Sequence, residues 1–365
     1  MIILFTSNIK GGILQFTIQI LKELKEMNYE VLAFIPQNSK YSVDEKYSKY
    51  IVHYKKCKTL NIYSEKLNII EKHIIDLNPH LIWYCDNSIL CSEMICRLSN
   101  NNSIKQLLTM HDAGTSHLTN NNSLRDRIHK AIEKNFSEKS FKKCDNILIL
   151  SQESKMKYLN KYMDFSSKVI VMPLGAHVPD VYEIKPSEID YNEKYFLFFG
   201  RIDKYKGILN MLKAYEKCKP SNKLIIAGNG DFSKEELLYI KNNKKIIVIN
   251  RYIEDSEMIY LFKNSLGVIL PYIEATQSGI IPIAYKYSKP VIISNIAGLK
   301  QFVVQNETGF ICLKDEDYMK AIKQLDKIDI RAKMGTNCLN YYNKNLEWKR
   351  NIVKILNELK ILNDK

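Results

Sequence analysis

The sequence has no stretch of about 18 consecutive apolar residues, the length that a membrane-spanning helix needs. Residues 1–8 lack the basic segment that opens a secretory signal peptide, and we expect them to begin a first strand instead. The eight cysteines are scattered, and none belongs to a Cys-x-x-Cys pair. This distribution argues against a zinc site and against a disulfide framework, and it favours a cytoplasmic protein.

Motifs for nucleic-acid binding are also lacking, although the net charge is +14. The lysines are spread over the whole length instead of forming one basic block, so we expect no nucleic-acid partner. The charge favours a weak attraction to an anionic membrane surface, or it reflects only a composition rich in Lys, Ile and Asn. With 365 residues, 45% hydrophobic and 26% charged, the chain is long enough for about two globular domains.

The stretch 195–207 indicates a binding site. Residues 195–199 form a short apolar run typical of a strand buried on both faces, and Gly200 ends it. Arg201 and Lys206 follow, and after Gly207 the apolar residues recur with helical spacing. Two cations between a buried strand and a helix start favour a phosphate or diphosphate ligand. The alternative is a solvated loop in a lysine-rich protein.

The first half reads as an α/β domain that begins with a strand, a glycine turn, a helix and a strand. Gly11 and Gly12 in that turn would let a ligand approach the backbone, although many such turns carry glycine for geometry alone. His111 and Asp112 follow a predicted strand, where sites of such folds form, but a lone histidine there can also be structural. The strands predicted in this half are 1–6, 31–35, 81–84, 105–110, 146–150 and 168–172, and further helices are predicted at 64–77 and 124–141.

A second α/β alternation follows a proline-containing segment, 178–192, which we interpret as a linker. The predicted organisation is thus one α/β domain at 1–177, a second at 193–345, and an amphipathic helix at 346–365. Two such domains would face each other across a cleft. The strands predicted in the second domain are 195–199, 223–227, 245–249, 266–270, 290–294 and 310–312.

These features resemble the retaining glycosyltransferases of the GT-B fold, specifically glycosyltransferase family 4. The resemblance covers most of the chain and is stronger after Tyr195 than before it. The segments that carry it are Phe198-Phe199-Gly200-Arg201 with Lys206-Gly207, residues 224–230 with Gly228 and Gly230, residues 268–271, residues 289–292, the expected loops 297–299 and 306–310, Gly11-Gly12, and His111-Asp112.

The resemblance implies a fold of two Rossmann-like domains, an acceptor domain at 1–177 and a donor domain at 193–345, with the helix at 346–365 returning to the first domain. It also implies roles for particular residues. Arg201, Lys206 and His111 would be catalytic: the two cations would stabilise the leaving diphosphate, and His111 would contact the donor sugar or orient the acceptor. We expect Ser278 to cap a helix, and Gly279 to permit a close approach of the backbone to a phosphate. The donor-binding residues would be Gly11, Gly12, Gly200, Gly228, Gly230, Glu274, Gln277, Ser278 and Gly279.

One departure from the family concerns a pair of glutamates eight positions apart. Counting back from Pro290, the second falls on Ile283, and Glu274 lies one place away from the first. The missing glutamate puts the usual contact to the ribose hydroxyls in doubt. Asp315-Glu316-Asp317 matches a metal-binding pattern of another transferase fold, but it is better read as an acidic helix start.

The function that the resemblance implies is transfer of a sugar from a nucleotide-diphosphate sugar to an acceptor hydroxyl, with no cofactor and no metal. The acceptor would be a saccharide or a lipid-linked saccharide of bacterial surface polysaccharide or lipopolysaccharide assembly, at the inner face of the cell membrane. A non-catalytic partner or scaffold of a transferase stays open as an alternative because of Ile283. A nucleotide-sugar epimerase lacks a carboxylate pair that we can place.

Overall fold

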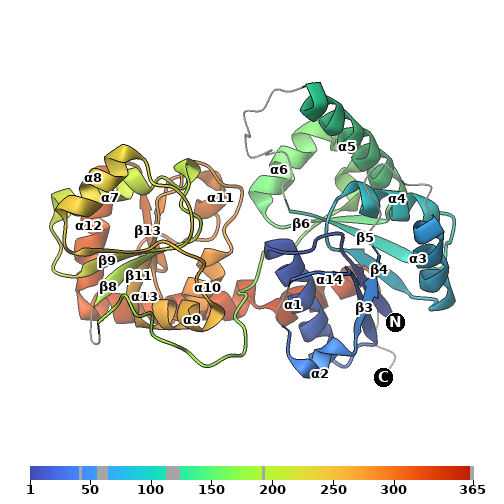
Figure 1. Ribbon diagram of the computed structural model, residues 1–365, viewed down its shortest axis with the longest axis horizontal. Coiled ribbons are helices and arrows are strands. Elements are labelled where there is room, and N and C mark those ends of the chain that lie inside the picture. The colour runs from blue at the N-terminus through green and yellow to red at the C-terminus, as the bar shows by residue number, and fades with distance from the viewer. Residues whose placement is uncertain (41–42, 56–64, 112–123, 191–193, 362–365) are drawn as a thin grey trace. The chain divides into compact units, whose positions relative to one another are not determined.

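The chain divides into two compact units in the computed structural model, which describes residues 1–40, 43–55, 65–111, 124–190 and 194–361. The first unit consists of Met1–Pro173 and Trp348–Lys365, and the second of Leu174–Glu347. Each unit is a parallel sheet with helices on both of its faces (Figure 1). The segment predicted as a linker, 178–192, falls inside the second unit.

The sheet of the first unit has seven parallel strands in the order β3-β2-β1-β4-β5-β6-β7. Its strands are β1 (Ile2–Phe5), β2 (Val31–Pro36), β3 (Ile51–Tyr54), β4 (Leu81–Tyr84), β5 (Lys105–Met110), β6 (Asn146–Ile149) and β7 (Val169–Val171). Its helices are α1 (Gly12–Glu26), α2 (Glu45–Ser48), α3 (Glu65–Asp76), α4 (Ile89–Leu98), α5 (Leu124–Lys143), α6 (Gln152–Lys161), the 3-10 turn η1 (Met163–Lys168) and the C-terminal α14 (Trp348–Glu358).

The second unit has six parallel strands in the order β10-β9-β8-β11-β12-β13. Its strands are β8 (Tyr195–Phe199), β9 (Lys223–Ala227), β10 (Ile246–Ile249), β11 (Ser265–Leu270), β12 (Val291–Ser294) and β13 (Gly309–Cys312). Its helices are η2 (Lys204–Lys206), α7 (Ile208–Cys218), α8 (Lys234–Asn242), α9 (Asp255–Asn264), α10 (Ile280–Lys286), α11 (Ala297–Lys300), α12 (Asp315–Asp326), α13 (Ile328–Tyr341) and η3 (Tyr342–Leu346).

The strand order reverses once in each sheet, between β1 and β4 and between β8 and β11. At such a reversal the loops after the two central strands diverge to opposite faces, so the carboxyl edge of the sheet opens there for a ligand. In the second unit these are the loops after β8 and β11, and in the first unit they are the loops after β1 and β4. The predicted site residues lie at or next to these two positions.

The C-terminal helix α14 packs against α1 of the first unit (Figure 1). The ring of Trp348 meets the ring of Phe16 edge-on, with 5.7 Å between their centroids. Ile352, Ile355 and Leu356 on the same face are buried as well. The apolar face of α14 is therefore buried by packing within this unit. In the part of the chain that the structure describes, no helix is both long enough and apolar enough to span a membrane.

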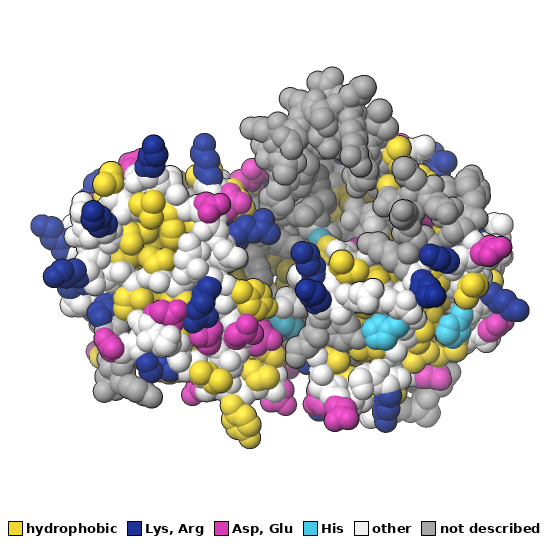
Figure 2. Space-filling view, viewed as in Figure 1, with side chains coloured by type: hydrophobic (Ala, Val, Ile, Leu, Met, Phe, Trp, Pro, Cys, Tyr) yellow, Lys and Arg dark blue, Asp and Glu magenta, His cyan; other side chains and the backbone are white. Residues whose placement is uncertain are grey.

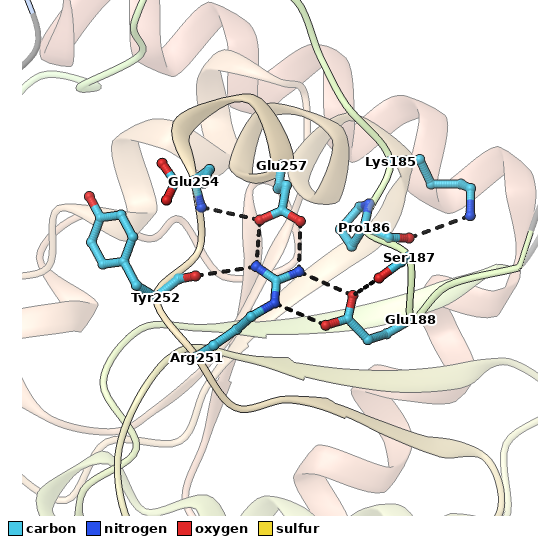
Figure 3. A network of polar contacts seen from close by, with 8 residues as sticks. All are labelled: Lys185, Pro186, Ser187, Glu188, Arg251, Tyr252, Glu254 and Glu257. Carbon is cyan, nitrogen blue, oxygen red and sulfur yellow. Dashed lines mark hydrogen bonds and ion pairs between the residues drawn. The ribbon is translucent and has the colours of Figure 1, made fainter.

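A guanidinium network fixes the start of the second unit (Figure 3). Arg251, in the loop after β10, donates two hydrogen bonds to Glu257 at 2.6 and 2.7 Å and two to Glu188 at 3.0 and 3.1 Å. Hydrogen bonding to Arg251 lowers the pKa of both carboxyls. The network ties residue 188, which precedes β8, to the N-terminal turn of α9. This attachment explains why the proline-rich segment belongs to the second unit.

Candidate active site

The loop after β8 has the local structure that its sequence predicts. Gly200 follows the strand with a φ of 132° in open space, and the single 3-10 turn η2 leads into Gly207. Gly207 has a φ of 65° and precedes the first residue of α7, Ile208. A Cβ at Gly207 would lie 2.0 Å from the carbonyl oxygen of Pro271, in the loop after β11. Glycine is therefore required where the two central loops touch.

Arg201 and Lys206 differ sharply in their surroundings. The Arg201 side chain is exposed, and no hydrogen bond or ion pair joins it to any residue that the structure describes. Lys206 is half-buried, and burial lowers the pKa of its ammonium group. Its Nζ atom lies 3.6 Å from the centroid of the Tyr272 ring and 4.9 Å from that of Tyr205. The loop thus presents one solvated and one partly desolvated cation.

The loop after β11 is joined to the loop after β8 by backbone contacts as well. The Ile273 amide donates a 2.8 Å hydrogen bond to the Tyr205 carbonyl oxygen. Tyr272, between Pro271 and Ile273, is buried, and burial raises the pKa of its phenol to about 12. Sequence reasoning missed Tyr272, although an aromatic residue directly after a buried strand at a reversal of strand order is a signal that could have been used.

The remaining residues predicted in the β11 loop lie close together in sequence but differ in exposure. Glu274 and Gly279 are exposed, Gln277 is partly buried and Ser278 is buried. The prediction that Ser278 caps the following helix needs correction. The cap position of α10 is Gly279, and the Ser278 hydroxyl accepts a 3.2 Å hydrogen bond from the amide of Ile280, the first helical residue.

Ile283, at the position where the family often has glutamate, is buried in the core of the second unit. Residues 297–299, expected as a loop, form the single helical turn α11, which is a second correction. The turn is fixed by packing, because a Cβ at Gly298 would lie 2.1 Å from the carbonyl oxygen of Ala275. The β11 loop is therefore supported from the β12 side as well as from the β8 side.

The glycines after β9 allow its loop to lie directly against the loop after β8. A Cβ at Gly228 would lie 2.0 Å from the carbonyl oxygen of Gly200, and one at Gly230 would lie equally close to that of Ile202. The Ile202 amide donates a 3.0 Å hydrogen bond to the Asn229 carbonyl oxygen. These two glycines serve backbone packing behind Arg201, and their roles as direct ligands stay a prediction.

Gly11 and Gly12 lie at the start of α1, after the central strand β1. Gly11 has a φ of 83° and is the cap residue of the helix, and a Cβ at either glycine would meet no neighbour. The loop that carries them is held by a buried carboxylate, Asp86, two residues after the end of β4. Asp86 accepts hydrogen bonds from the Thr6 hydroxyl at 2.8 Å, the Ser7 amide at 2.7 Å, the Ser7 hydroxyl, the Asn8 side chain, the Ser88 amide and the Cys91 thiol.

Asp86 was not among the residues that the sequence singled out. Burial alone would raise the pKa of its carboxyl, but the hydrogen bonds from Ser88, Ser7, Thr6 and Cys91 outweigh burial and lower it. Asp86 is therefore ionised at neutral pH and holds the loops after β1 and β4 together. An acid two residues after a predicted buried strand was the available signal.

His111 lies at the end of β5 in the first unit, as predicted. Its Nε2 atom is 2.9 Å from the Cys85 carbonyl oxygen, and since a carbonyl oxygen only accepts, Nε2 carries the proton in this contact. The Phe16 ring meets the imidazole edge-on at 5.0 Å. The ring of His111 is thus oriented by two elements, β4 and α1. Asp112 lies outside the described residues.

The acidic triplet at 315–317 begins helix α12, as the sequence predicted. Asp315 forms a 2.7 Å ion pair with Lys217, and Asp317 accepts hydrogen bonds from the amides of Leu313 and Lys314. Glu316 forms a 4.0 Å ion pair with Lys314, so each of the three carboxylates has a partner within the unit. Within the described residues, no cluster of three His, Cys, Asp or Glu side chains has the geometry of a metal site.

Comparison with known proteins adds to this geometry. Residues 182–339 match the family model described as glycosyl transferases group 1. The match lies within the second unit, Leu174–Glu347. An uncharacterized glycosyltransferase of Methanocaldococcus jannaschii is 25% identical over 97% of this chain and 95% of its own length. On this evidence the chain is a glycosyltransferase, which confirms the resemblance on which the sequence interpretation rests.

Two further proteins are similar to this glycosyltransferase. The capsular polysaccharide biosynthesis glycosyltransferase CapM of Staphylococcus aureus is 24% identical over 53% of this chain and 55% of its own length. The crystal structure of Anabaena HepE in complex with UDP-glucose superimposes with a TM-score of 0.71, at 14% identity, over 99% of this chain and 100% of that one. The two parallel-sheet domains thus match those of a GT-B glycosyltransferase, and the predicted fold class is confirmed.

Proposed function

We propose that this glycosyltransferase moves a sugar from a nucleotide-diphosphate sugar to an acceptor hydroxyl with retention of the anomeric configuration. The observation that carries the proposal is the pair Arg201 and Lys206 in the loop after β8, where the strand order reverses. No carboxylate of the described residues forms an ion pair with either cation. Both charges are therefore available to an anionic ligand.

The chemistry asked of this loop is stabilisation of a leaving group. As the bond to the sugar breaks, negative charge grows on the terminal phosphate of the nucleoside diphosphate, and preorganised cations lower the energy of that state. Arg201 offers a planar, two-pronged donor, and Lys206 offers a point charge in partly desolvated surroundings. We propose that these two groups suffice and that no metal is needed.

The other predicted site residues have supporting roles in this proposal. Glu274, Gln277, Ser278 and Gly279 follow β11 at the same reversal of strand order, and they would contact the donor. His111 would contribute from the first unit, with the Cys85 carbonyl group and Phe16 holding its ring. Gly11 and Gly12 leave open space beside α1, which suits a ligand that approaches the backbone.

The acceptor and setting are proposed from the relatives. CapM is named for capsular polysaccharide biosynthesis, and a structural neighbour, WaaG, is described as involved in lipopolysaccharide biosynthesis. We propose a saccharide or lipid-linked saccharide acceptor in assembly of a surface polysaccharide, with the enzyme acting at the cytoplasmic side of the membrane. The fold alone does not select an acceptor, so this part depends on the analogy.

A screen of nucleotide sugars by thermal shift tests the proposal first, because a ligand that binds only the native state raises the melting temperature. UDP-glucose is the first probe, since HepE was crystallised with it. The stabilising donor is then incubated without acceptor, and release of nucleoside diphosphate is measured. Slow hydrolysis supports an enzyme, whereas binding without any hydrolysis or transfer favours the non-catalytic scaffold. Nuclear magnetic resonance of the product's anomeric proton tests retention.

A further inference from the structure

The contact between Lys206 and Tyr272 joins the two loops at the reversal of strand order in the second unit. The Tyr272 ring is 1% exposed, and the Lys206 ammonium lies over it at 3.6 Å. Around this contact, Gly207 touches Pro271 and the Ile273 amide bonds to the Tyr205 carbonyl oxygen. The backbone of one loop is therefore held against the other on both sides of the lysine.

Contact with an aromatic ring, in place of a carboxylate, has a specific consequence for this cation. The ring attracts an ammonium group through its quadrupole and carries no net charge. A carboxylate in the same place would hold the lysine more strongly, but it would neutralise the charge and compete with an anionic ligand. Tyr272 can therefore fix the position of Lys206 while leaving its full positive charge for a phosphate.

We infer that Tyr272 is a positioning residue for Lys206, acting through the face of its ring. The inference rests on the proposed function, because Lys206 must meet a diphosphate for its position to matter. A lysine side chain loses considerable rotamer freedom when it is fixed. Since the ring restricts Lys206 before the ligand arrives, less of that entropy is lost on binding, and the complex is tighter.

The ring and the hydroxyl of Tyr272 can be separated experimentally. The hydroxyl is buried and has no hydrogen-bond partner of normal geometry among the described residues, and the neighbouring Ser278 does not offset its desolvation, so its pKa stays raised. Tyr272→Phe keeps the ring face and removes this hydroxyl. Tyr272→Leu removes the ring. The inference assigns the effect to the ring, so the two variants should behave differently.

The test is a double-mutant cycle on the affinity for UDP, with UMP as the probe that lacks the terminal phosphate. Wild type, Tyr272→Leu, Lys206→Ala and the double variant are measured by calorimetry. We expect Tyr272→Leu to weaken UDP roughly tenfold and to reduce the preference for UDP over UMP. In the Lys206→Ala background the same change should cost less than about twofold, because the ring then has no cation to hold.

Control variants distinguish positioning from simple loss of packing. Tyr272→Phe should stay within about threefold of wild type. Tyr285→Leu removes another buried tyrosine of this unit, whose hydroxyl bonds to Thr308 at 2.8 Å, and it should lower the melting temperature while keeping the UDP affinity. Tyr205→Leu removes the more distant ring, at 4.9 Å, and a side-chain hydrogen bond to Lys206, and it should still weaken UDP less than Tyr272→Leu does.

Three results would overturn the inference. They are an unchanged UDP affinity in Tyr272→Leu, an equal loss in Tyr272→Phe and Tyr272→Leu, and additive effects of Tyr272→Leu and Lys206→Ala. Failure of the proposed function looks different, because then the wild type itself would bind neither UDP nor GDP nor ADP. That result would remove both the proposal and this inference.

Discussion

Burial is the largest influence on the pKa of three ionisable side chains in this protein. Lys206, Lys289 and Asp86 are each at least half-buried, yet only Asp86 has enough hydrogen-bond partners to offset its desolvation. Desolvation disfavours the charged form of a group, and a hydrogen bond to the charged form restores it. The two lysines are therefore less easily protonated than ordinary lysines, and the aspartate is more easily ionised than ordinary aspartates.

Lys289 shows what such burial costs. Burial, together with Arg331 and Lys194, lowers the pKa of Lys289 to about 8, against roughly 10.4 in an unfolded chain. Below pH 8 the folded state holds a disfavoured charge. Lys289→Met should therefore raise the free energy of unfolding at pH 7 by about 1–3 kcal/mol. Urea denaturation measures this, with the exposed Lys286→Met as the matched control, which should change it by less than about 0.5 kcal/mol.

The pH dependence follows from the same shift. Between about pH 8 and pH 10 the unfolded state binds more protons at this position than the folded state, so the stability of the wild type rises with pH. The advantage of Lys289→Met should shrink over that range. A constant advantage from pH 7 to pH 10 would mean that the ammonium of Lys289 is already well solvated in the folded protein.

His111 is another single residue whose role can be tested. Its imidazole is only partly buried and is contacted by the Cys85 carbonyl group and the Phe16 ring. His111→Ala should therefore keep the melting temperature within a few degrees while lowering turnover roughly a hundredfold. The exposed His53→Ala is the control. If His111→Ala melts normally and transfers sugar at the wild-type rate, the histidine is structural.

At the scale of elements, buried strands were the most predictable feature of the sequence. Strands β4, β5, β8 and β9 lie where their apolar runs placed them, since strands inside a parallel sheet are covered on both faces. The edge strand β3 was missed, because its four residues are mostly half-exposed and form no apolar run. Contacts between loops could not be predicted either, since they depend on which strands are neighbours.

Asp86 is such a contact between elements, and it fastens the loop of β1 to the loop of β4. The Asp86 carboxylate only accepts hydrogen bonds, and donors surround it. In Asp86→Asn the amide nitrogen itself donates, so some of the surrounding donors lose their acceptor. We expect a loss of roughly 3 kcal/mol in the free energy of unfolding, measured by urea denaturation. Asp164→Asn, at an exposed aspartate of the same unit, is the control and should be nearly neutral.

The acid sensitivity of this contact has a definite sign. The pKa of Asp86 is lower in the folded state than in the unfolded state, so its contribution to stability is present above about pH 4 and is lost as the pH falls further. Asp86→Asn should flatten the acid limb of the stability profile. An acid limb as steep as that of the wild type would show that other carboxylates determine it.

At the scale of the whole molecule, the net charge of +14 is the feature without an assigned role. On the face shown in Figure 2, Lys and Arg side chains are scattered among acidic ones and do not gather into one patch. A diffuse charge attracts an anionic surface weakly and over a range set by salt. We therefore expect weak, reversible binding to anionic lipid.

Liposome sedimentation measures this attraction. Vesicles with anionic lipid should bind the protein at low salt and release it at 1 M salt, where screening shortens the range of charge attraction to about 3 Å. Neutral vesicles are the control. Binding that does not respond to salt, or no binding to anionic vesicles at all, would mean that the net charge does not attract the protein to membranes and reflects its amino-acid composition only.

The central claim is that Arg201 and Lys206 stabilise a departing diphosphate without a metal. It is tested most directly by single-turnover transfer with the donor found in the screen, with and without EDTA. The loss of one preorganised contact of this kind costs ~3–4 kcal/mol, so Lys206→Ala should slow the chemical step roughly a hundredfold to a thousandfold. Arg201→Lys should be slowed as well, because an ammonium group cannot replace a planar two-pronged donor.

The neighbouring exposed Lys204→Ala is the matched control and should transfer at nearly the wild-type rate. All the variants should melt near the wild type, because Arg201 and Lys204 are exposed and removal of the Lys206 ammonium also removes its desolvation cost. The account predicts that EDTA leaves the wild-type rate unchanged while both site variants are slow. Abolition of wild-type transfer by EDTA, or full activity in Lys206→Ala and Arg201→Lys, would contradict it.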